Sequence, residues 1–195
     1  MPLGIVLMYR SNLGPPPLAT LAVHISTLLP ITLGTASFIL QTTIMVMVMA
    51  INRKISSVLI FVAATLLGFG IDFWDLIVLR GLAVEGLVFQ VMVFLIGLFF
   101  LTFGQNFIRY SHFRATPLIE YMFLFQKLYK TDSVLLARFS VESSILIVSI
   151  SVALLGGLGT GAIRIGTILI LGGLPTVMKM QDAWMHDVFD KKKLA

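Results

Sequence analysis

The stretch that decides the fold class is residues 83–108, which reads AVEGLVFQVMVFLIGLFFLTFGQNFI and holds one ionisable residue, Glu85. A run of about 20 predominantly apolar residues is long enough to cross the hydrocarbon core of a bilayer as an α-helix. Four more runs have similar length and composition: Leu33–Ile51, Ser57–Leu79, Val134–Leu155 and Gly161–Met180. The sequence therefore predicts an all-α, polytopic transmembrane helical bundle with about five full spans.

The composition of the whole chain favours the same class. Of the 195 residues, 58% are hydrophobic and 12% are charged, whereas a soluble domain has about 25% charged residues. High hydrophobicity with little charge also excludes a disordered chain. The absence of cysteine excludes disulfides and thiolate-held metal sites. Because no metal-binding or nucleophile–base pattern occurs either, we expect no metal, no cofactor, no catalytic residue and no enzymatic activity.

The basic residues predict how the chain is oriented. If the five long runs alternate, ten of the fourteen Lys and Arg residues fall on one side, within residues 53–54, 109–130 and 179–193. Cytoplasmic loops collect Lys and Arg, so we expect this side, with the tail 181–195, to face the cytoplasm. The net charge of +5 then indicates topology and contact with the lipid bilayer, and no nucleic-acid partner is expected.

Two shorter apolar runs, Pro17–Leu29 and Pro117–Tyr129, suggest an internal repeat. Both open with Pro-Leu, about 100 residues apart, and both lead into a long run with a polar residue, Gln41 or Glu142. We expect one membrane domain, 1–195, with repeat halves 1–80 and 83–180, inverted if each half has three helices. The first half begins with a truncated helix, and the short runs are either re-entrant or interfacial helices.

Four short motifs occur in an order that resembles a known family. They are MYRSNLGPPP at residues 8–17, GFGIDFW at 68–74, Arg138 with Glu142, and GLGT at 157–160. Together they resemble the YczE/YyaS/YitT family of bacterial integral membrane proteins. The chain departs from the family pattern at residues 18–20, where Leu-Ala-Thr stands in place of Trp-Asp. The resemblance implies a bacterial plasma membrane location and a role in transport or in membrane-associated accessory work.

Ionisable and polar residues inside the runs are the candidate site, because burying them in a bilayer is costly. The candidate intramembrane polar residues are Glu142, Arg138, Gln41, Asp72, Asp75 and Arg164. Arg138 and Glu142 are four residues apart and share a helix face. They form either a polar site between the halves or a self-neutralised pair. Asp72 and Asp75 are expected to meet Arg164, and the cluster is either a gate or cationic-group site, or an interhelical tie.

Glycine and proline mark the candidate turns and half-helix ends. These residues are Gly14, Pro17, Pro117, Gly157, Gly159 and Thr160. The segment 156–161 lacks the Lys-Ser/Thr of a phosphate-binding loop, so a tight turn between two spans is expected. If the short helices enter the membrane, their ends could contribute to a substrate site.

Two functions remain open from the sequence. The first is a small-solute transporter or solute-binding membrane protein, with a polar cavity lined by Glu142, Gln41 and Asp72. The alternative is a non-transporting accessory protein that acts through a membrane partner or as a homo-oligomer.

Overall fold

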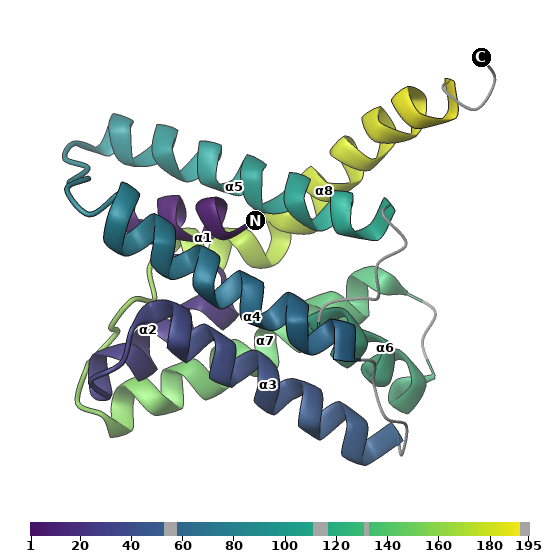
Figure 1. The fold of residues 1–195 in the computed structure, drawn as a ribbon, viewed down its shortest axis with the longest axis horizontal. Helices are drawn as coiled ribbons and strands as arrows, with labels where there is room; N and C mark the ends of the chain where they lie inside the picture. The colour runs from purple at the N-terminus through teal and green to yellow at the C-terminus, as the bar shows by residue number, and fades with distance from the viewer. Residues whose placement is uncertain (53–57, 111–116, 131–132, 192–195) are drawn as a thin grey trace.

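The computed structural model describes residues 1–52, 58–110, 117–130 and 133–191 (Figure 1). All regular secondary structure in these residues is helical, which confirms the predicted helical membrane bundle. The helices are α1 (Pro2–Arg10), α2 (Pro17–Leu28), α3 (Leu33–Asn52), α4 (Val58–Asp72), the π-helix η1 (Phe73–Val78), α5 (Leu87–Tyr110), α6 (Pro117–Tyr129), α7 (Val134–Leu155) and α8 (Ile165–Lys191).

In the described part of the chain, four helical stretches are long and apolar enough to cross a membrane, where five were expected. They are Leu33–Ile51, Phe61–Val78, Leu87–Ile108 and Leu136–Leu155. The fifth expected span lies in α8, where the described residues contain a shorter apolar helical stretch, Ile165–Leu174. Helix α8 continues to Lys191, so the described part of the expected cytoplasmic tail, residues 181–191, is helical.

The two short helices begin where the sequence predicts. Pro17 opens α2 and Pro117 opens α6, and proline is well suited to the first helical turn because its missing N–H has no intrahelical acceptor there. Helix α2 packs against α7, and α6 packs against α3. Both short helices therefore contact long ones, although Phe123, Leu128 and Tyr129 of α6 remain exposed.

Helix α1 lies along α5, and α3 lies along α4 (Figure 1). Glycines allow the first pair to approach closely, because a Cβ atom on Gly4 would lie 2.5 Å from the carbonyl oxygen of Gly97. A Cβ on Gly104 would likewise lie 2.8 Å from the backbone nitrogen of Met1. Small residues are the usual means of close helix packing in membranes, where lipid is as apolar as the side chains.

The main hydrophobic core lies between α1, α2, α3, α4, α5 and α8, and includes Val6, Ala22, Ile71 and Leu101. A smaller cluster of Leu21, Val141 and Ile145 joins α2 to α7. Only 28% of each candidate span is buried. Many of the other apolar side chains, such as Leu66, Phe69 and Leu95, are exposed, as expected for helices that lipid solvates.

Candidate functional site

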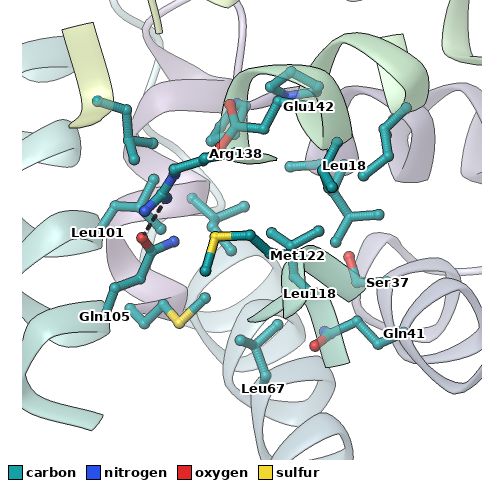
Figure 2. Close-up of a pocket in the computed structure, with 18 of the residues that line it drawn as sticks. Leu18, Ser37, Gln41, Leu67, Leu101, Gln105, Leu118, Met122, Arg138 and Glu142 are labelled. Atoms are coloured by element: carbon teal, nitrogen blue, oxygen red, sulfur yellow. Dashed lines mark hydrogen bonds and ion pairs between the residues drawn. The ribbon is translucent and has the colours of Figure 1, made fainter. Parts of the chain in front are cut away.

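A cavity of about 360 Å³ lies between the helices and is the main candidate site (Figure 2). Helices α1, α2, α3, α4, α5, α6, α7 and α8 all contribute to its wall. Its polar lining residues are Ser37, Gln41, Gln105, Arg138 and Glu142, and its apolar ones include Leu18, Leu67, Leu101, Leu118 and Met122. The cavity is thus an apolar chamber with a few polar side chains, the usual composition of a small-molecule site.

Arg138 and Glu142 form the expected pair on α7, with Arg138 Nε donating to Glu142 Oε1 at 3.2 Å. The guanidinium also donates to Gln105 Oε1 at 2.8 Å (Figure 2). It contacts the sulfur of Met178 at 2.6 Å. Glu142 is 6% exposed, and its Oε2 is buried without a hydrogen-bond partner. The arginine therefore connects α7 to α5 and α8 while its charge is compensated within the cavity wall.

Gln41 and Ser37 bring a second polar surface to the cavity from α3. They are four residues apart, so they lie on one face of the helix. Gln41 is only 5% exposed, yet its side-chain amide has no hydrogen-bond partner among the residues that the structure describes. An unpaired buried amide is costly, so this amide is available to a molecule inside the cavity.

Gln41, Arg138 and Glu142, predicted to share a site, all line this cavity, but Asp72 does not. Asp72 instead accepts hydrogen bonds at the start of α3, from the Gly34 N–H at 2.8 Å and the Thr32 hydroxyl at 2.6 Å. A carboxylate is favourable at a helix N-terminus because free N–H groups and the helix dipole converge there. Asp72 thus caps a neighbouring helix, a role that the prediction of a cavity residue missed.

The expected partner of Asp75 is also wrong. Asp75 pairs with Arg10, whose Nη2 lies 2.7 Å from Asp75 Oδ1 and also donates to the Asp75 carbonyl oxygen at 3.0 Å. Asp75 lies in the π-helix η1, and a π-turn changes both side-chain direction and backbone bonding locally. The sequence of an apolar run does not reveal such a turn. The expected pairing with Arg164 therefore rested only on the similar depth of the two residues in their spans.

We call Arg10, Thr32, Gly34, Asp72 and Asp75 the η1 junction, because they connect α1, α3 and α4 around η1. Its carboxylates bind either a guanidinium or a helix N-terminus. The junction fits the interhelical-tie alternative for Asp72 and Asp75, with Arg10 as the cation.

His24, which is buried, makes hydrogen bonds that the sequence did not predict. It is 1% exposed on α2, and its Nε2 accepts the Ala162 N–H at 2.9 Å. Its Nδ1 faces the carbonyl oxygen and the hydroxyl of Ser149, at 3.1 and 3.0 Å. Since Nε2 accepts, the proton of a neutral ring is assigned to Nδ1. His24 therefore fastens α2 to α7 and to the following turn.

The predicted turn residues lie at helix connections. Gly14, with φ of 101°, precedes α2, while Gly157 and Gly159, with φ of 70° and 62°, follow α7. Thr160 belongs to the same turn, and Arg164 is exposed at its end. Pro17 lines the main cavity, whereas Arg164 and Gly14 line a separate hollow of about 260 Å³ beside His24. The candidate residues are thus divided between two places.

Gln105 lines the cavity but was not among the predicted site residues, because it is an uncharged residue inside the most hydrophobic run. The available signal was the amide pair Gln105–Asn106, near the end of that run. Asn106 is fully buried and donates to the Met178 carbonyl oxygen at 3.1 Å. Polar residues in a span indicate a contact or a site, but only the packing tells which.

Comparisons with known proteins agree with the resemblance inferred from the motifs. The model described as "Family of unknown function (DUF6198)" matches residues 1–181. The "Uncharacterized protein YyaS" of Bacillus subtilis (strain 168) is 28% identical over 174 residues, which cover 88% of this chain and 83% of that protein. No solved structure matches. The chain therefore belongs to the DUF6198 family, and its similarity to YyaS confirms the expected YyaS-type relationship.

Proposed function

We propose that this protein is a small-solute transporter or a solute-binding membrane protein, and that the main cavity holds the solute. The observation that carries the proposal is a group of polar side chains, the buried Gln41 and Glu142 with the half-buried Arg138, that lines an otherwise apolar chamber. Intramembrane ionisable residues are functional-site candidates because their burial must be compensated. The proposed role is non-enzymatic.

The helix contacts support the proposed internal repeat. The packing of α2 on α7 has a counterpart in the packing of α6 on α3, as a two-fold relation between α1–α4 and α5–α8 requires. At the α1–α5 contact, the approach of Gly4 to Leu101 has a counterpart in the approach of Gly104 to Met1. These pairs follow the sequence offset of about 100 residues between Pro17 and Pro117.

Matched positions of the two proposed halves also line the cavity together. The lining pairs are Ile5 with Gln105, Leu18 with Leu118, and Gln41 with Glu142. A cavity at the boundary between repeats is where secondary transporters bind their substrates. We further propose that the protein lies in the plasma membrane with its C-terminus in the cytoplasm, because Lys and Arg are concentrated on that side of the expected spans.

A solute screen on the full chain in detergent tests the proposal. A solute that binds the folded state raises its melting temperature, so we expect at least one hit with the unmodified protein. The same hit should be lost in Ser37→Leu, which fills the cavity, and retained in Thr43→Val, because Thr43 is exposed on the same helix. Counterflow of the labelled hit in proteoliposomes then separates transport from binding alone.

Ser37→Leu could prevent folding, so Glu142→Gln serves as a second cavity variant. Glutamine has nearly the same shape as the glutamate that it replaces, so this variant should fold. The proposal is overturned if every stabilising solute acts equally on the unmodified protein and on both cavity variants.

A partner-binding role is the second candidate, and one observation favours it. Among the residues that the structure describes, a Cβ atom on Gly172 or Gly173, both on α8, would meet nothing within 4 Å. Small residues without a neighbour could admit another membrane helix. Gly172→Leu should then dissociate a co-purifying partner or a second copy in mild detergent, as measured by native mass. A single-chain mass for the unmodified protein would contradict this role.

A further inference from the structure

The polar groups of the main cavity differ in how available they are. Arg138 and Glu142 neutralise each other, and the guanidinium is further occupied by Gln105 and Met178. Glu142 Oε2 has no partner, but it is shielded from contact with water. The ionic part of the wall is therefore already balanced, and it has no spare counter-ion for a solute with a net charge.

The amide of Gln41 differs from this pair, because it is almost buried, lines the cavity and has no hydrogen-bond partner in the described part of the chain. Its atoms are not among the fully shielded unpaired groups, as Glu142 Oε2 is. An amide offers one acceptor and two donor hydrogens. A solute that carries both a donor and an acceptor can satisfy Gln41 without adding charge.

The rest of the wall determines the body of the solute. Leu67, Leu118 and Met122 surround the space beside Gln41 (Figure 2). An apolar body gains by leaving water for such a wall, and a volume of about 360 Å³ is at the small end of ligand pockets. Burial of an uncompensated charge in the same place would be costly.

We propose that the solute is a small, uncharged, amphipathic molecule whose amide or hydroxyl group hydrogen-bonds to Gln41 and whose apolar body contacts Leu67, Leu118 and Met122. This inference rests on the proposed solute-binding function and adds the chemical class of the solute. Gln41 acts as the specificity-determining residue, and the Arg138–Glu142 pair acts as the element that disfavours net charge.

Four compounds with one carbon skeleton test this class: 3-phenylpropanamide, 3-phenylpropylammonium, 3-phenylpropanoate and propylbenzene. We expect the amide to raise the melting temperature of the full chain by about 2–4 °C at saturating concentration. The ammonium, the carboxylate and the hydrocarbon should give little or no shift. Propylbenzene controls for partition into the detergent micelle, because it keeps the apolar body without the polar group.

Matched variants on α3 locate the effect. Gln41→Leu keeps a similar size and loses no hydrogen bond, so it should fold and lose at least three quarters of the amide-induced shift. Thr43→Val, on the exposed side of the same helix, should retain it.

The inference is overturned if a charged compound gives the larger Gln41-dependent or Glu142-dependent shift, and in that case the proposed function still stands. It is also overturned if none of the four compounds acts. The proposed function itself falls only when the wider solute screen yields no cavity-dependent hit either.

Discussion

Two arginine–carboxylate pairs in this protein have the same chemistry and different surroundings. In the η1 junction, Arg10 binds both the carboxylate and the backbone carbonyl of Asp75, and nearby Asp72 closes the start of α3. In the cavity, Arg138 and Glu142 stand beside an open space of about 360 Å³. The difference teaches that the packing around an intramembrane ion pair decides whether it ties helices together or forms part of a site.

The largest loss of stability is expected when the η1 junction loses Asp72. Asp72→Ala removes the acceptor of the Gly34 N–H and of the Thr32 hydroxyl. We expect the free energy of unfolding to fall by about 2–4 kcal/mol, because two part-buried donors lose a charged partner. A titration with a denaturing detergent measures it. Asp72→Asn keeps an acceptor oxygen and should lose about half as much, so equal losses would argue against the capping role.

A smaller loss is expected from Asp75→Ala. The change leaves Arg10 without its carboxylate, which costs about 3–5 kcal/mol for a fully buried pair. Because the Arg10 side chain is 25% exposed, we expect about 2 kcal/mol. The double variant Arg10→Ala/Asp75→Ala should lose less than the sum of the single changes, as a double-mutant cycle measures. Strict additivity would mean that the two residues do not stabilise each other.

The cavity pair should tolerate the loss of its carboxylate better than the η1 junction does. In Glu142→Gln, Arg138 keeps its bond to Gln105 and can face the cavity. We expect a loss of about 1 kcal/mol, within the range for a neutral hydrogen bond, and a much larger effect on solute binding. Melting curves with and without the screening hit separate the two. A loss of stability as large as that of Asp75→Ala would make this pair another tie.

The smallest effect on stability is expected from Gln41→Leu. Its amide makes no hydrogen bond to the described residues, and replacing an unpaired buried polar group by an apolar one is neutral or stabilising. We expect the free energy of unfolding to change by less than about 0.5 kcal/mol in the absence of solute. A large loss in the detergent titration would show that Gln41 supports the fold itself.

Much of the fold follows from short-range patterns. The length of the apolar runs predicts α3, α4, α5 and α7 closely, since a helix that crosses a bilayer must satisfy its own backbone and present apolar side chains. Pro17 and Pro117 correctly predict the starts of α2 and α6. The fifth expected span lies in α8, where the apolar stretch found among the described residues, Ile165–Leu174, is shorter than the other four.

The candidate site was predictable where its members are close in sequence. Arg138 and Glu142 are one helical turn apart, so their pairing follows from helix geometry. The proposed repeat matches Gln41 to Glu142, and both residues line the cavity. Partners more distant in sequence were not predictable, as Asp75 shows by pairing with Arg10 across 65 residues.

The sequence by itself determined the class of the protein, the positions of its helices and the few polar residues that a bilayer makes costly. Local composition and periodicity carry that information, because each helix satisfies its own backbone hydrogen bonds. Only the tertiary structure decided that Asp72 caps α3, that His24 fastens α2 to α7, and that Gln41 faces a hollow. These roles depend on which helix faces which, and that is a property of packing between segments distant in sequence.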